Sequence, residues 1–281
     1  MDQLNANAWV GRAVSERGRI DATTAAQLHA TIGRPDTPTP RHGDLLPGLW
    51  HWCAFPPLTH VEHLGADGHP GPGVLMPPLP LPRRMWAGGS LRFHAPLRVG
   101  DTLTRQSTVR AVKQKDGATG PMALVTVDHT VTGPRGLAIE ERQDIVFMDI
   151  PDSFTPPTKR PLPVDATERV DMSAPLLFRY SALTFNAHRI HYDLDYTRAV
   201  EHYPNLVVHG PLQASLMMRH ATTQKGRAPI QFDFRAVHPM FAGTPLDLCG
   251  QEDKEEGIMT LWSGQDGHQG MVATAIWDGT Q

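Results

Sequence analysis

The sequence predicts an α+β fold made of two similar halves, each a set of antiparallel strands with one helix. Three observations support this prediction. Stretches of strand-forming residues alternate with Gly-, Asp- and Pro-containing turns in both halves. A proline-rich, polar segment at 150–164 has the composition of an extended linker. A short pattern also occurs once on each side of that segment.

The repeated pattern is Arg-x-x-x-Pro-x-x-x-Gly-x-x-Leu. Arg235 follows Arg92, and Leu246 follows Leu103, by the same 143 positions. An ungapped repeat of this kind indicates a duplicated α+β unit. We therefore predict three parts: an N-terminal domain at 1–149, a linker at 150–164 and a C-terminal domain at 165–281.

The N-terminal half contains several recognisable elements. Asp21 is a suitable N-cap for a helix over 22–32, and the residues before it fit a strand or a loop. The apolar segment 46–55 occupies the place of that half's central helix. Residues 60–82 form a loop rich in Gly and Pro, and a loop of this length is usually functional or mobile, so it can fold over a ligand. Across the whole chain the predicted strands are 91–93, 101–113, 122–131, 140–148, 232–236, 246–250, 257–263 and 271–277.

The segment 178–220 holds most of the candidate chemistry. We predict a strand over 178–185, then a loop dense in histidine, then a helix capped by Asp193 or Asp195. Gly210 and Pro211 mark the start of a second helix through about residue 222, because Pro fits the first helical turn. That helix is apolar on most sides, which predicts burial. Its N-terminus would favour negative charge.

The composition excludes several classes of protein. The chain has 281 residues, 40% of them hydrophobic, and a net charge of −3, which indicates a globular protein. No run of Lys or Arg suggests nucleic-acid binding, and no apolar run is long enough to span a membrane. Two cysteines give no disulfide framework and no zinc pattern. With no secretory signal evident, we expect a cytoplasmic protein.

These motifs resemble those of the MaoC-like, hot-dog-fold hydratases and dehydratases that act on acyl thioesters. The R-specific enoyl-CoA hydratases carry Asp-x-Asn-Pro-x-His followed by His-Gly at the start of the central helix. By spacing, Asn186 takes the Asp place, His191 the His place and His209-Gly210 the His-Gly place. The form Asn-Ala-His-Arg-Ile-His-Tyr-Asp is closer to one branch, which comprises mesaconyl-C4-CoA and itaconyl-CoA hydratases and 3-hydroxyacyl thioester dehydratases. The resemblance covers almost the whole chain.

The resemblance implies a double hot-dog fold, in which each unit is a curved antiparallel sheet wrapped round one helix. It also implies reversible hydration of an α,β-unsaturated acyl-CoA, with a short dicarboxylic substrate such as mesaconyl-C4-CoA or itaconyl-CoA expected. No cofactor is expected beyond the CoA of the substrate. The partners are then the acyl-CoA itself, with no nucleic acid and no membrane. A homodimer of double hot-dog chains is one assembly that the resemblance allows.

The same resemblance assigns roles to individual residues. His191 is the expected acid–base residue, because an imidazole titrates near neutral pH. Asn186 cannot act as a base, so we expect it to hold the water. His188 is expected to position the acyl group or to assist, and the Gly210 N–H to stabilise the enolate oxygen. The substrate-binding candidates are Arg189, which can grip a substrate carboxylate, together with His209 and Asp193.

Simpler and competing interpretations stay open. Asp193 is favoured as a helix cap over a base, and Gly210 serves as a helix start under either interpretation. His188 and His191 lack a third ligand at a zinc-like spacing, so no metal is expected. The N-terminal half lacks the histidine motif and is expected only to line the pocket. The alternative functions are a lipid-synthesis 3-hydroxyacyl-thioester dehydratase, a hot-dog thioesterase and a non-catalytic acyl-thioester-binding subunit.

Overall fold

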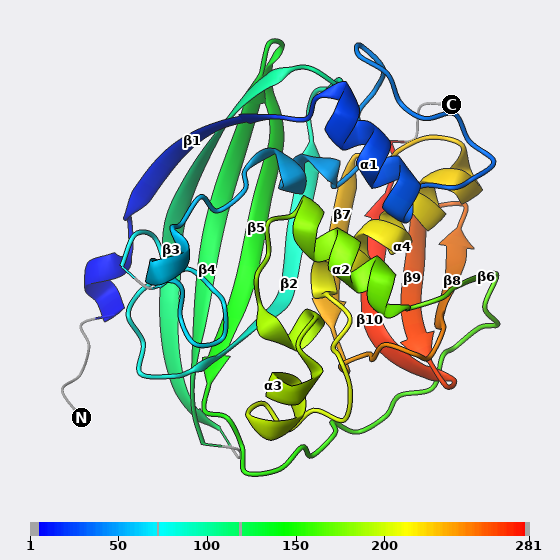
Figure 1. Ribbon diagram of the computed structural model, residues 1–281. Coiled ribbons are helices and arrows are strands. Elements are labelled where there is room, and N and C mark those ends of the chain that lie inside the picture. Colours follow the sequence, from blue (N-terminus) through cyan, green and yellow to red (C-terminus); the bar gives the residue numbers. More distant parts are fainter. Residues whose placement is uncertain (1–5, 72, 118–119, 279–281) are drawn as a thin grey trace.

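The computed structural model describes residues 6–71, 73–117 and 120–278. Ten strands form one sheet in the order β1-β3-β4-β5-β2-β7-β10-β9-β8-β6, and every named neighbouring pair is antiparallel (Figure 1). The first five strands in this order come from the N-terminal half and the other five from the C-terminal half. The predicted α+β class is confirmed.

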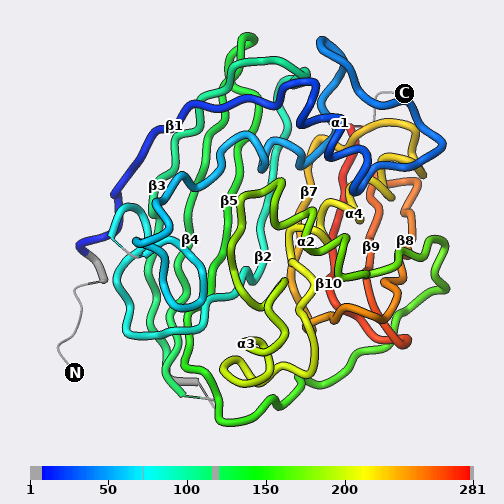
Figure 2. The backbone as a smooth tube through the Cα atoms, viewed as in Figure 1, coloured from blue at the N-terminus to red at the C-terminus, as the bar shows by residue number. Residues whose placement is uncertain are grey.

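The two halves of the sheet meet where β2 pairs with β7. The strands of the first half are β1 (Ala13–Arg19), β2 (Arg83–Phe93), β3 (Thr102–Gly117), β4 (Gly120–Gly133) and β5 (Gly136–Met148). Those of the second half are β6 (Glu168–Val170), β7 (Gln231–Ala236), β8 (Leu246–Asp253), β9 (Ile258–Gln265) and β10 (His268–Ile276). The segment between β5 and β6 runs along one end of the sheet, from the first half to the second (Figure 2).

The repeat is visible in the pairing of the two central strands. Ser90 lies opposite Asp233, and these residues are separated by the same 143 positions as the two copies of the pattern. The pseudo-two-fold axis of the duplication therefore passes between them. The glycines of the two copies, Gly100 and Gly243, both lie in the left-handed region, with φ of 96° and 88°. Glycine adopts this conformation at little steric cost, which explains its place in both turns.

The four α-helices lie on one face of the sheet (Figure 1). The buried helix predicted after residue 210 is α4, which packs against β7, β8, β9 and β10. The helices are α1 (Ala22–Ile32), α2 (Ala174–Leu183), α3 (Leu194–Ala199) and α4 (Gly210–Lys225). The 3₁₀ turns are η1 (Ala6–Trp9), η2 (Trp50–Ala54), η3 (Val61–His63) and η4 (Arg189–His191).

Two predictions about elements are wrong. The strand expected over 178–185 is the second half of α2, because Ser173 and Pro175 start a helix upstream of it. The segment 46–55 does not form a central helix but only the five-residue turn η2. Leu49, directly before η2, has a φ of 68°, which a regular helix cannot accommodate.

One apolar core joins the two halves. It combines the segment around η2, residues of α1, α2 and α4, and strands of both half-sheets. Because burial of apolar surface is the main stabilising term, this shared core holds the halves together. The domain boundaries at 149 and 165 stay predictions, since independent folding of each half is a separate property. No helix in the described parts of the chain combines the length and hydropathy needed to cross a membrane.

Candidate active site

Four imidazole rings lie in contact, one after another, beside the N-terminus of α4. The ring centroids are 4.1 Å apart for His69 and His188, 5.3 Å for His188 and His191, and 3.6 Å for His191 and His209. We call these four residues the histidine row. Three of them were predicted site residues, and the structure brings those three together.

Local structure explains how the C-terminal half places its three histidines. After α2 ends, Phe185 turns the chain through a φ of 51° into the loop that carries His188. His191 ends η4, and the N–H of Val207 bonds to the carbonyl of Ile190 beside it. His209 is the N-cap residue of α4 and is fully buried. The loop and the helix start are thus fixed against each other, and the row with them.

The hydrogen bonds of two histidines define their tautomers. The Nδ1 of His191 lies 2.7 Å from the carbonyl oxygen of Val207, and a carbonyl only accepts, so Nδ1 carries the proton. The Nδ1 of His69 lies 2.7 Å from the carboxylate of Asp67 and donates in the same way. In both neutral rings Nε2 is then the basic nitrogen. In each of these residues Nε2 is therefore the atom that can accept a proton.

Burial keeps the row neutral. It lowers the pKa of His191 to about 3, although the bond to Val207 opposes the shift. It lowers the pKa of His69 to about 4, with the nearby charge of Arg84 acting in the same direction and Asp67 opposing it. The pKa values of His188 and His209 also lie well below the usual range, again mainly through burial. Asp67 is the carboxylate best placed to stabilise a proton on the row.

Asn186 is the first and Gly210 the last residue of the predicted site motif in the C-terminal half. The side-chain oxygen of Asn186 accepts a 3.0 Å bond from the backbone N–H of His188, which orders the loop. Gly210 is the first residue of α4, where backbone N–H groups have no partner within the helix. A Cβ at Gly210 would find only ordinary contacts with Trp86 and Met271. The N–H groups of this first turn adjoin His209 and the row.

Arg189 and Asp193 bind each other. The guanidinium donates to Asp193 through Nε and one terminal nitrogen, at 3.0 and 2.8 Å. Its other terminal nitrogen donates to the carbonyl of Ala66, and the group lies over the ring of Tyr196. Asp193 also caps α3, as predicted. The charge of Arg189 is thus already engaged, and its side chain is 38% exposed.

The fourth histidine comes from the N-terminal half, which was predicted only to line the pocket. Residues 65–69 of the long loop lie against the histidine loop of the other half. The N–H of Arg189 bonds to the carbonyl of Asp67, and Gly68, with a φ of 87°, lies against the carbonyl of Ala187. The prediction that loop 60–82 can fold over a ligand gave the only sequence signal for this. Asp67-x-His69 alone has no distinctive pattern.

A cavity of about 790 Å³ opens beside this contact. Asp67, His69 and Arg84 line it together with Arg189. The remaining lining is largely apolar and comes from the long loop, β5 and α3, including Met76, Leu79, Leu81, Phe147 and Tyr196. His69 lines the cavity and contacts His188, so it connects the open space to the buried row.

Asp67, His69 and His188 each offer a ligand atom, and these atoms lie within 4.8 Å of one another, as a metal site requires. The donors are already engaged otherwise. Both carboxylate oxygens of Asp67 accept bonds from His69, and the charge of Arg84 acts on both histidines. A nearby cation opposes a metal ion, so we assign the group to proton chemistry. The expected absence of a metal stays a prediction.

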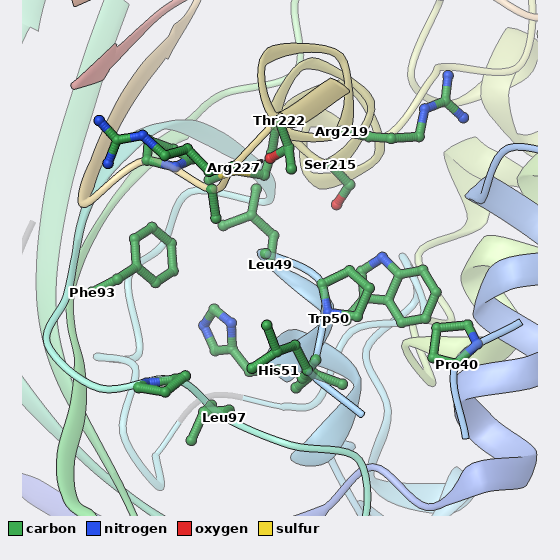
Figure 3. A pocket seen from close by; sticks show the side chains of 18 of the residues that line it. Pro40, Leu49, Trp50, His51, Phe93, Leu97, Ser215, Arg219, Thr222 and Arg227 are labelled. Atoms are coloured by element: carbon green, nitrogen blue, oxygen red, sulfur yellow. Dashed lines mark hydrogen bonds between the residues drawn. The ribbon is translucent and has the colours of Figure 1, made fainter. Parts of the chain in front are cut away.

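A second cavity, of about 620 Å³, lies along α4 (Figure 3). Leu49, Phe93 and Leu97 line one side of it, and Ser215 and Thr222 of α4 line the other. His51, also in its lining, is bonded to the buried Glu141 at 3.1 Å. Within the described chain, this lining includes no member of the histidine row. The second cavity is therefore not the place where the row would meet a ligand.

Solved structures share the fold of this chain. A MaoC-like dehydratase matches 97% of this chain over 100% of its own, with a TM-score of 0.71 and 14% identity. A Mycobacterium tuberculosis protein described as having a double hotdog fold matches 95% of this chain over 96% of its own, with a TM-score of 0.57 and 14% identity. The fold is thus the double hot-dog fold, as predicted.

Sequence comparison then defines the family. The family model for hydroxyacyl-thioester dehydratase type 2 matches residues 49–242, and the chain belongs to this family. The chain is also 42% identical, over 270 residues, to the mesaconyl-C(4)-CoA hydratase of Chloroflexus aurantiacus, a match that covers 95% of this chain and 96% of the relative. The predicted resemblance, including the branch, is confirmed, and the protein is a lyase of this class.

The contact at Gly68 can be tested by substitution. A Cβ there would lie 1.9 Å from the carbonyl oxygen of Ala187, so Gly68→Ala must displace one loop. Gly43→Ala is a matched control, because Gly43 has a φ of 86° and no atom within 4 Å of its Cβ position. Urea unfolding should show that Gly68→Ala costs about 1–3 kcal/mol more than Gly43→Ala, the usual cost of overpacking. Equal costs would contradict the contact.

Neutral burial of the row predicts a pH dependence of stability. Below about pH 6.5 the unfolded chain binds protons at His69 and His191. In the folded protein His69 binds a proton only near pH 4, and His191 only near pH 3. The free energy of unfolding therefore falls as the pH falls from about 6.5 to about 4. Replacing His191 by Gln should reduce this slope by up to about 1.4 kcal/mol per pH unit. His60→Gln, at a 70% exposed side chain, is the control. An unchanged slope in His191→Gln would show that this histidine is not buried neutral.

Proposed function

We propose that this protein is a hydro-lyase that reversibly adds water across the double bond of an α,β-unsaturated acyl-CoA. The observation that carries the proposal is the histidine row, with two basic Nε2 atoms, beside the N-terminus of α4. The 42% identity to a mesaconyl-C(4)-CoA hydratase over nearly the whole chain makes a short dicarboxylic acyl-CoA the first substrate to test. The product would then be a citramalyl-type thioester.

The chemistry needs a base for water and a donor for the thioester oxygen. The Nε2 of His191 takes a proton from water while the water oxygen bonds to the β-carbon. The electron pair of the double bond moves toward the thioester carbonyl, whose oxygen accepts a hydrogen bond from the Gly210 N–H. His191 then returns a proton to the α-carbon. The Nδ1 bond to Val207 keeps the ring oriented through both transfers.

Asn186 leaves the site without the acid found at that place in R-specific relatives. His69 takes over part of that role, because its Nε2 forms no hydrogen bond within the described chain while its Nδ1 donates to Asp67. The carboxylate stabilises a positive charge on the ring, as in other Asp–His pairs. His69 then shares the protons of the reacting water with His191, and Asn186 orders the loop and helps to hold the water.

The alternative function is the reverse reaction, dehydration of a hydroxyacyl thioester. The family is named for dehydration of hydroxyacyl thioesters, which uses the same groups in reverse. A thioesterase is disfavoured because the start of α4, residues 209–213, contains no Asp or Glu. A non-catalytic binding subunit is disfavoured by the two oriented histidines. The cytoplasmic location and a homodimer stay predictions.

Turnover of His191→Ala tests the assignment of the base. The variant should hydrate mesaconyl-C4-CoA about 10²–10⁴-fold more slowly than the unaltered protein, the usual worth of general acid–base catalysis. His60→Ala, at an exposed loop position, is the control. Loss of the conjugated-thioester absorbance measures hydration, and a free-thiol assay run in parallel detects hydrolysis. Near-normal turnover in His191→Ala would remove it from the mechanism, and thiol release by the unaltered protein would favour a thioesterase.

Asp67→Asn tests the second acid–base group. Asn keeps the size of the side chain but removes the charge that stabilises a protonated His69. We expect turnover to fall about tenfold, because the pKa of the His69 ring should change by about one unit. The acid limb of the pH–rate profile should move with it, whereas a loss confined to thermal stability would show that Asp67 only holds the loop.

A further inference from the structure

Arg84 stands out among the cations near the site because it forms no hydrogen bond within the described chain, and Asp67 is the carboxylate whose charge acts on it. Among the residues that the structure describes, Arg84 forms no ion pair and no hydrogen bond. Burial lowers the pKa of its guanidinium to about 10. Asp67 is the nearby carboxylate that acts on it, yet both oxygens of Asp67 already accept bonds from His69. Arg84 is half-buried and lines the cavity, and a partly desolvated cation without a hydrogen-bonding partner is unfavourable.

The neighbouring arginine shows what a structural role looks like here. Arg83 donates to the carboxylate of Glu201 at 2.7 Å, donates to the same residue's carbonyl, and lies over the ring of Tyr203. Its side chain is 6% exposed and that of Glu201 is 1% exposed. Arg83 thus fixes β2 against the other half. Arg84, next along the same strand, lines the cavity instead.

The position of Arg84 relates its charge to the reaction. It shares the lining of the 790 Å³ cavity with Asp67 and His69. Its charge also acts on both His69 and His188, which places the guanidinium close to the open end of the histidine row. Most of the remaining lining is apolar apart from Arg189 and Asp195, and Arg189 is already paired with Asp193.

We infer that Arg84 binds the free carboxylate of a dicarboxylic acyl thioester and thereby sets the substrate preference of the site. This inference rests on the proposed function. A planar guanidinium can hold a carboxylate through two parallel hydrogen bonds, which fixes orientation as well as position. A carboxylate held beside His69 brings the β-carbon that bears it toward the bases. The role predicted for Arg189 passes to Arg84, because Arg189 is already paired with Asp193.

The test compares mesaconyl-C4-CoA with crotonyl-CoA, which lacks the carboxylate. For Arg84→Gln we expect kcat/KM on mesaconyl-C4-CoA to fall about 100-fold relative to the fall on crotonyl-CoA. Arg84→Lys keeps the charge but cannot form two parallel hydrogen bonds. It should therefore restore part of the kcat/KM ratio between mesaconyl-C4-CoA and crotonyl-CoA. Arg189→Gln should lower kcat/KM on both substrates to the same extent, because it loosens the loop. An unchanged ratio in Arg84→Gln, or a ratio that changes only in Arg189→Gln, overturns the inference.

A stability measurement separates this role from a structural one. Because Arg84 is half-buried and forms no hydrogen bond within the described chain, its removal should leave the melting temperature of the free protein unchanged or higher, whereas loss of a structural arginine lowers it. A lower melting temperature in Arg84→Gln therefore counts against the inference. If the unaltered protein hydrates neither substrate, the proposed function fails, and calorimetric titration decides the inference. Weaker binding of mesaconyl-C4-CoA but not of crotonyl-CoA to Arg84→Gln then supports it, and equal binding overturns it.

Discussion

The contact between two loops, one from each half of the chain, is the constraint on which the site depends. Residues 65–69 lie against residues 186–189 so closely that Gly68 leaves no room for a side chain. The N–H of Arg189 bonds to the carbonyl of Asp67 at 2.9 Å, and its guanidinium bonds to the carbonyl of Ala66. This contact brings His69 to His188 and so completes the histidine row.

The duplicated halves have diverged in what they contribute. The C-terminal half keeps a long buried helix, and its N-terminus provides N–H donors beside His209. The N-terminal half has a short 3₁₀ turn in the corresponding segment, and its long loop crosses to the other half. Burial explains the electrostatics that result. It keeps the imidazoles in the neutral form that a base requires, and it lowers the pKa of Arg84.

Local sequence patterns predicted most of the fold and about half of the candidate site. The repeat around Arg92 and Arg235 predicted the duplication, because the same offset sets the pairing of β2 with β7. The strand prediction over 178–185 was wrong because it weighed the aromatic residues of that segment and not the helix start at Ser173, five positions before Phe178. His69 and Arg84 could not be predicted, since their roles arise from contacts across the chain. Arg189 was assigned to a substrate carboxylate, whereas its guanidinium binds Asp193, the N-cap of α3, four residues further on.

We propose that both halves of the chain build one site at the histidine row. The most direct measurement is a crystal structure with a bound, non-reactive analogue of a dicarboxylic acyl-CoA. We predict that the free carboxylate binds Arg84, that the β-carbon lies beside His69 and His191, and that the thioester oxygen accepts a hydrogen bond from the Gly210 N–H. An acyl group bound instead in the second cavity, between Leu49 and Thr222, would contradict it.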